Sequence, residues 1–178
     1  MVRRGANGGL FGRRPSSEAV ARMASVYLRA EGTTVVDLAR SWFLLLEQSA
    51  RLAAENPDDA ERLSLSEKVA ELEEGANASE APPGSEAVHL FALRLADVSG
   101  SSTLRLFVRV LSSLISEMPA DMRKVGRIPE LHVDVLTILS EVSAAVLRGD
   151  GAQAAWAVHK HADPMIQWLV DSMPGRSV

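Results

Sequence analysis

The sequence contains no cysteine. This excludes disulfide bonds, thiolate catalysis, and zinc or iron–sulfur sites built from thiolates. Histidine is scarce, at four residues, and aromatic residues make up only 4% of the chain. Because strands are enriched in aromatic and β-branched residues, a chain poor in aromatics and rich in alanine and leucine favours helices. Histidine is left as the main candidate for binding a metal.

Long apolar runs are also missing. The longest, residues 42–46, is far too short to cross a bilayer. Arg3 and Arg4 are similar to the basic start of a secretion signal, but Gly5 and Asn7 follow where an apolar stretch should stand. We therefore expect a cytoplasmic protein with no membrane partner.

Sequence motifs of common enzymes are not found. Residues 5–12 are rich in glycine, but they lack the Lys-Ser/Thr pair of a phosphate loop and follow no apolar strand. No Gly-x-Ser-x-Gly elbow occurs. The acidic pairs Asp58–Asp59 and Glu73–Glu74 fall in loops and at helix ends, where they compensate helix dipoles or face solvent. We expect no catalytic residues and no enzyme.

Helical periodicity runs from residue 16 almost to the C-terminal end. Capping residues, glycines and prolines divide this stretch into helices joined mostly by short loops. The expected helices begin near residues 16, 34, 57, 85, 101, 130 and 150, and the clearest linker is 75–84. Pro164 lies inside the last helix and should kink it. The sequence predicts an all-α antiparallel bundle of about seven helices.

Apolar stripes predict which face of each helix is buried. In the first helix the stripe holds Val20, Met23, Ala24, Tyr27 and Leu28. The third helix is less regular, with Leu63, Leu65, Val69 and Leu72 facing inward. The tryptophans Trp42, Trp156 and Trp168 also fall at apolar positions, so we expect each in the core or at a dimer interface.

The first fifteen residues form a separate, non-helical segment rich in glycine and arginine. Gly8-Gly9 is a turn signal, so the segment is predicted to be a loop or a hairpin. Its four arginines meet no acidic residue, whereas the rest of the chain is net acidic. Any contact with phosphate would therefore involve this segment, although such tails are more often simply solvated.

Histidines at two positions are candidates for a buried site. His159 and His161 are two residues apart on one helix and must point to different faces. His161 shares a face with Ala157 and Val158, so we expect it to point inward. His89 stands beside Val88 in the fourth helix. From the residues alone, a hydrogen-bonded core histidine is the favoured interpretation of each.

Three segments of the sequence resemble the C-terminal, effector-binding (FCD) domain of the FadR subfamily of GntR-type bacterial transcriptional regulators. The first is similar to the wing of a winged helix-turn-helix, the second to the long second helix of the sensing domain, and the third to its last helix. These segments are residues 2–16, residues 37–54, and Arg148-Gly149-Asp150 with Ala154, Ala155 and His161.

The resemblance implies a helical bundle that binds a small effector, often a carboxylate, in a central cavity and pairs with a second copy. It divides the chain into a wing-like remnant and linker, 1–15, and a helical domain, 16–174. It implies DNA contacts at Arg3, Arg4, Gly8 and Gly9. The helices that would enter the DNA major groove are not in this sequence.

Many members of that family hold a divalent metal with one aspartate and three histidines. His89 and His161 match two of these ligands, but Ser85 stands at the aspartate position and Leu139 at a third histidine position. His132 lies two helical turns before Leu139, too far to substitute for it. Two imidazoles make a poor metal site, so we expect no metal and no other cofactor.

Two further departures concern the second helix, where Arg40 and Trp42 stand in place of the family's usual Glu and Arg. The candidate pocket residues are thus His89, His161, Trp42, Arg40, Ser85 and Leu139. They favour an apolar pocket for a carboxylate or acyl-type effector. The alternative is a structural dimerisation module whose pocket has closed. An enzyme using His89 and His161 as metal ligands would need a third ligand, which we do not find.

Overall fold

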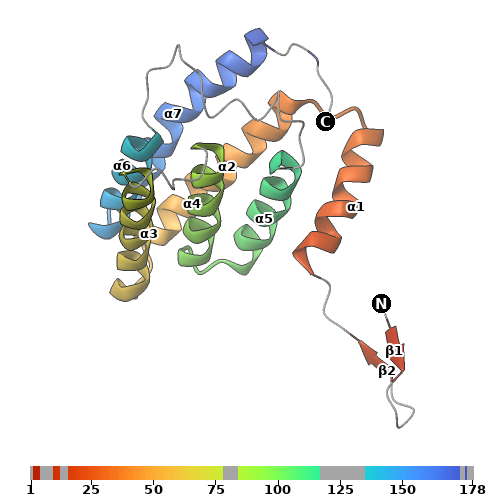
Figure 1. The fold of residues 1–178 in the computed structure, drawn as a ribbon, viewed down its shortest axis with the longest axis horizontal. Helices are drawn as coiled ribbons and strands as arrows, with labels where there is room; N and C mark the ends of the chain where they lie inside the picture. The colour runs from red at the N-terminus through yellow and green to blue at the C-terminus, as the bar shows by residue number, and fades with distance from the viewer. Residues whose placement is uncertain are drawn as a thin grey trace.

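The computed structural model describes residues 2–4, 10–12, 16–77, 84–116, 135–172 and 175. Within these ranges the fold is seven helices preceded by a short β-hairpin (Figure 1). The elements are β1 (Val2–Arg4), β2 (Leu10–Gly12), α1 (Ser17–Ala30), α2 (Val35–Ala54), α3 (Asp59–Asn77), α4 (Gly84–Val98), α5 (Ser102–Ser116), α6 (Val135–Leu147) and α7 (Gly151–Ser172). The predicted all-α bundle is confirmed.

Local capping interactions set the helix starts, as the sequence predicts. The Thr34 hydroxyl accepts a hydrogen bond from the Asp37 amide at 3.2 Å, and the Asp150 carboxylate accepts one from the Gln153 amide at 2.9 Å. Between α6 and α7, Gly149 adopts a φ of 73°, a left-handed conformation that glycine tolerates best. Each of these positions is recognisable in the sequence because a cap depends only on near neighbours.

Strands β1 and β2 pair in antiparallel register, with Val2 opposite Gly12 and Arg4 opposite Leu10. Of the two alternatives for the N-terminal segment, the hairpin is the one observed. The predicted turn at Gly8-Gly9 lies outside the described residues.

Helix α2 runs through the middle of the bundle and contacts α4, α5, α6 and, most extensively, α7. Helices α2 and α7 are antiparallel: Gly151 at the start of α7 lies beside Arg51 near the end of α2, whereas Leu169 clusters with Leu38 near the start of α2. Helix α6 packs on α7 and α3, and α1 packs on α5 (Figure 1).

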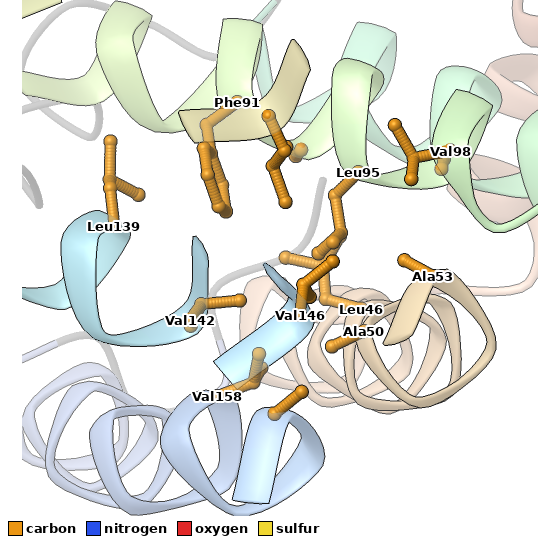
Figure 2. Packing of buried hydrophobic residues seen from close by; sticks show 14 of the residues in the cluster. Leu46, Ala50, Ala53, Phe91, Leu95, Val98, Leu139, Val142, Val146 and Val158 are labelled. Atoms are coloured by element: carbon orange, nitrogen blue, oxygen red, sulfur yellow. The ribbon is translucent and has the colours of Figure 1, made fainter. Parts of the chain in front are cut away.

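The main core is an apolar cluster of side chains from α2 to α7. Figure 2 shows members of four of these helices pointing into it, among them Leu46 of α2, Phe91 of α4, Leu139 of α6 and Val158 of α7. Such burial contributes roughly 25 cal/mol per Å² of apolar surface removed from water, which makes this cluster the main source of stability. In the part of the chain that the structure describes, no helix is both long and apolar enough to span a membrane.

Three predictions about faces and boundaries are wrong. Met23 and Tyr27 of α1 are exposed, because α1 packs chiefly on α5 through the face that carries Ala21. Leu63 of α3 is likewise 47% exposed. The predicted linker starts too early, since α3 continues past Gly75 to Asn77. Pro164 lies inside α7, as the sequence predicts.

Candidate functional site

Trp42 lies inside the bundle at the position where the sequence predicts a pocket wall. Its side chain is buried, and its indole N–H donates a 2.9 Å hydrogen bond to the hydroxyl of Ser112 on α5. Its ring meets Phe43 edge to face, with centroids 5.1 Å apart. Leu139 of α6 is buried in the same apolar cluster. Two predicted pocket residues are therefore part of the packed core.

His89 occupies the second turn of α4 and is half-buried. Burial lowers its pKa from the ordinary value of 6.5, and the nearby Glu86 carboxylate partly opposes that effect. No residue in the described ranges forms a hydrogen bond with His89. Both ring nitrogens are therefore free of protein partners within the described structure.

His161 faces α6 rather than the centre of the bundle. Its Nε2 lies 3.1 Å from a carboxylate oxygen of Glu141, and its side chain is 19% exposed. The same carboxylate accepts a hydrogen bond from the Lys160 ammonium at 2.6 Å. Lys160, and then His161, lower the pKa of the Glu141 carboxyl. This group joins α7 to α6.

The residues described do not fit the metal centre that the family resemblance implies. Among them, no three histidine, aspartate or glutamate side chains gather closely enough to hold a metal ion. The side chain of Ser85 and the whole of His132 lie outside the described residues. His161 is engaged by Glu141, and Leu139 offers no donor atom. The groups around His161 therefore form an ion-pair cluster and not a set of metal ligands.

A groove of about 640 Å³ lies on the outer side of the α2/α7 pair. Its apolar lining consists of Phe43 and Leu44 from α2 and Ala162, Pro164 and Ile166 from α7. Its polar lining consists of Arg40, Glu47, His159, Asp163 and Gln167. Arg40 therefore borders this outer groove and not the interior pocket for which it was a candidate.

His159 and its partners form the polar part of the groove. Its Nδ1 lies 3.1 Å from a Glu47 carboxylate oxygen, and its Nε2 lies 3.6 Å from Asp163. The hydrogen bond with Glu47, then the charge of Glu47, raises the pKa of His159 above 6.5. The exposed ring of Trp156 stacks at 5.5 Å, tilted by 36°, on the imidazole.

The histidines can be recognised as candidates in the sequence, but the carboxylates that contact them cannot. His159 and Glu47 are 112 residues apart, so no local spacing could have paired them. Glu141 looks like any acidic residue on an amphipathic helix. The expectation that His159 and His161 point to different faces agrees with their contacts to α2 and α6. The DNA-contact candidates Arg3 and Arg4 lie in β1, and nothing beyond their backbone pairing is described.

A family model described as the FCD domain matches residues 37–163. The match begins in the first turn of α2 and ends within α7, so it spans most of the bundle. Searches of curated proteins and of solved structures find no match.

Proposed function

Because the chain belongs to the FCD-domain family, the C-terminal domain of GntR/FadR-type transcription regulators, we propose that it is the effector-binding and dimerising half of such a regulator. The observation that carries the proposal is the family match across α2 to α7. FCD domains belong to regulators and not to enzymes. On this proposal the protein works in the cytoplasm, and a winged helix-turn-helix, of which the β1–β2 hairpin is the wing, contacts DNA.

The chemistry of the interior supports an effector with an apolar body and one polar head. The cluster around Trp42 and Leu139 is almost entirely apolar, and its few polar groups, such as Ser112, are already hydrogen-bonded. His89, whose neighbours Val88 and Leu90 pack against this cluster, supplies an imidazole that forms no hydrogen bond within the described residues. An imidazole N–H can donate a hydrogen bond to a carboxylate. A medium-chain acyl carboxylate is therefore the effector class that we propose.

Thermal unfolding with added acids tests this proposal. Octanoate and dodecanoate are compared with citrate, which has carboxylates but no apolar chain. A ligand that binds only the folded state should raise Tm by roughly 5–10 °C at about one hundred times its Kd. His89→Leu should reduce the shift, whereas the control His159→Leu, on the outer face, should not. A shift with citrate and none with the fatty acids would contradict the proposal.

A structural dimerisation module with a closed pocket is the second candidate. The hydrogen bond between Trp42 and Ser112 and the burial of Leu139 favour it, because they fill the space that an effector would occupy. On this alternative the protein is a dimer, and none of the acids changes Tm. Native mass spectrometry of the purified chain would distinguish the two, since a working sensor would retain or accept a small molecule.

A further inference from the structure

Trp156 is unusual among the apolar side chains of α7 because it is 54% exposed. Tryptophan buries more apolar surface than most residues and dominates many protein interfaces. The indole is also held in place, since it stacks on His159, which Glu47 fixes from α2. A side chain already oriented before association loses little conformational entropy on binding. The sequence predicts that this tryptophan lies either in the core or at a dimer interface. Because it is exposed, the core prediction is wrong and the interface prediction remains.

The groove between α2 and α7 begins beside this tryptophan, at His159 and Glu47. Leu44, 61% exposed, forms part of its wall. A projecting indole and an apolar groove thus lie on one face of the same molecule. In a two-fold pair each copy would supply one projection and one groove, which is the arrangement that an isologous interface requires.

The charges on this face also favour a second copy of the chain as its partner. Arg40 is exposed, and in the described ranges no acidic side chain forms an ion pair with it. Asp163 has a side chain 70% exposed, and among the described residues it forms one ion pair, with His159 at 3.6 Å. A uniformly basic or acidic partner would meet one like charge here. A second copy, with its α7 against α2 of the first, brings its Asp163 towards Arg40.

We propose that two copies of this chain pair through the α2/α7 face, with Trp156 of each copy seated in the groove of the other. The inference rests on the proposed function, because it names the surface for the dimerisation proposed there. The interface is isologous, with Arg40 of each copy facing Asp163 of the second.

Sedimentation of the full chain over a range of concentrations tests the surface. The wild-type protein should form a dimer, and Trp156→Ala should raise its dissociation constant roughly tenfold or more. The control Tyr27→Ala removes an aromatic side chain that is 63% exposed on α1, outside the groove, and should leave dissociation unchanged. Circular dichroism establishes that each variant is folded.

A charge exchange tests the orientation. Arg40→Glu and Asp163→Arg should each weaken the dimer, and the double variant should recover most of the association. A dimer unchanged by Trp156→Ala, or a double variant no tighter than the singles, overturns this surface and leaves the proposed dimerisation standing. A wild-type monomer overturns both. The proposed effector is tested separately, by the shift in Tm that the added acids cause.

Discussion

The contact between Trp42 and Ser112 shows how one pair of residues defines the bundle interior. Trp42 is large enough to fill the centre, but its indole N–H must be hydrogen-bonded when it is buried. Ser112, 2% exposed on α5, supplies the acceptor. The sequence indicates that Trp42 faces inward, because it lies on the apolar stripe of α2. It does not indicate Ser112, because a serine 70 residues away carries no pattern that marks it as the acceptor.

Ser112→Ala should lower the free energy of unfolding by about 1–3 kcal/mol, since it leaves the indole N–H buried without an acceptor. Ser113→Ala is the matched control: this neighbour is only partly buried, and its side chain forms no hydrogen bond within the described structure. Urea unfolding followed by fluorescence measures both. Equal losses in the two variants would mean that the hydrogen bond contributes nothing specific.

Glu47→Gln should lower the pKa of His159 towards 6.5, because it removes the charge and weakens the hydrogen bond that raise it. In the wild-type protein the raised pKa means that the protonated pair stabilises the fold below the unfolded-state pKa of histidine. This contribution is lost as pH rises through the folded-state pKa. Titration of the imidazole by NMR measures the change. Glu141→Gln should leave His159 unaffected, since Glu141 contacts Lys160 and His161 instead.

At the scale of elements, the sequence predicts where helices begin and end better than which way they face. Caps such as Thr34 and Asp150 are local, so the chain displays them directly. The buried face of α1 depends on where α5 lies, and that position is set by contacts distant in sequence. The predicted apolar stripe of α1 has the correct helical period, but the buried face is centred on other residues. Met23 and Tyr27 were therefore wrongly predicted to be buried. The outer groove was not predicted for the same reason.

Gly149→Ala should destabilise the turn between α6 and α7 by about 1–2 kcal/mol, because a side chain is strained at a φ of 73°. Space is not the cause, since an added Cβ would meet its nearest neighbour, the Ala54 carbonyl oxygen, at an ordinary 3.7 Å. Gly149→Asn should cost less, because asparagine adopts left-handed conformations more readily. Thermal or chemical unfolding compares the two. A larger loss for asparagine would contradict the conformational explanation.

For the whole molecule, the family match and the packing together describe the helical bundle of an FCD regulator domain. The fold class was predictable, because helical periodicity persists through the chain. The candidate site was predictable only in part, since His89 and His161 are visible in the sequence while their distances from other groups are not. What each histidine faces depends on the packing of α4, α6 and α7 around it.

The purified protein should contain much less than one equivalent of zinc, nickel or manganese per chain. His161 is engaged by Glu141, and Leu139, for which the resemblance implies a histidine, has no atom that could bind a metal. Elemental analysis after dialysis without chelator measures the metal content. A melting curve unchanged by a chelator is the second expectation. One tightly held equivalent per chain would contradict this account of the interior.

Three consecutive residues of α7 tie it to helices on two sides. His159 contacts Glu47 on α2, while Lys160 and His161 contact Glu141 on α6. If α7 rotated about its own axis, its contacts with Glu47 and with Glu141 would both break. If α7 moved together with α2 and α6, these contacts would be kept. A displacement of α7 at the outer groove should therefore carry α2 and α6 with it. The two acidic residues thus add polar contacts to the packing that already joins α7 to α2 and to α6.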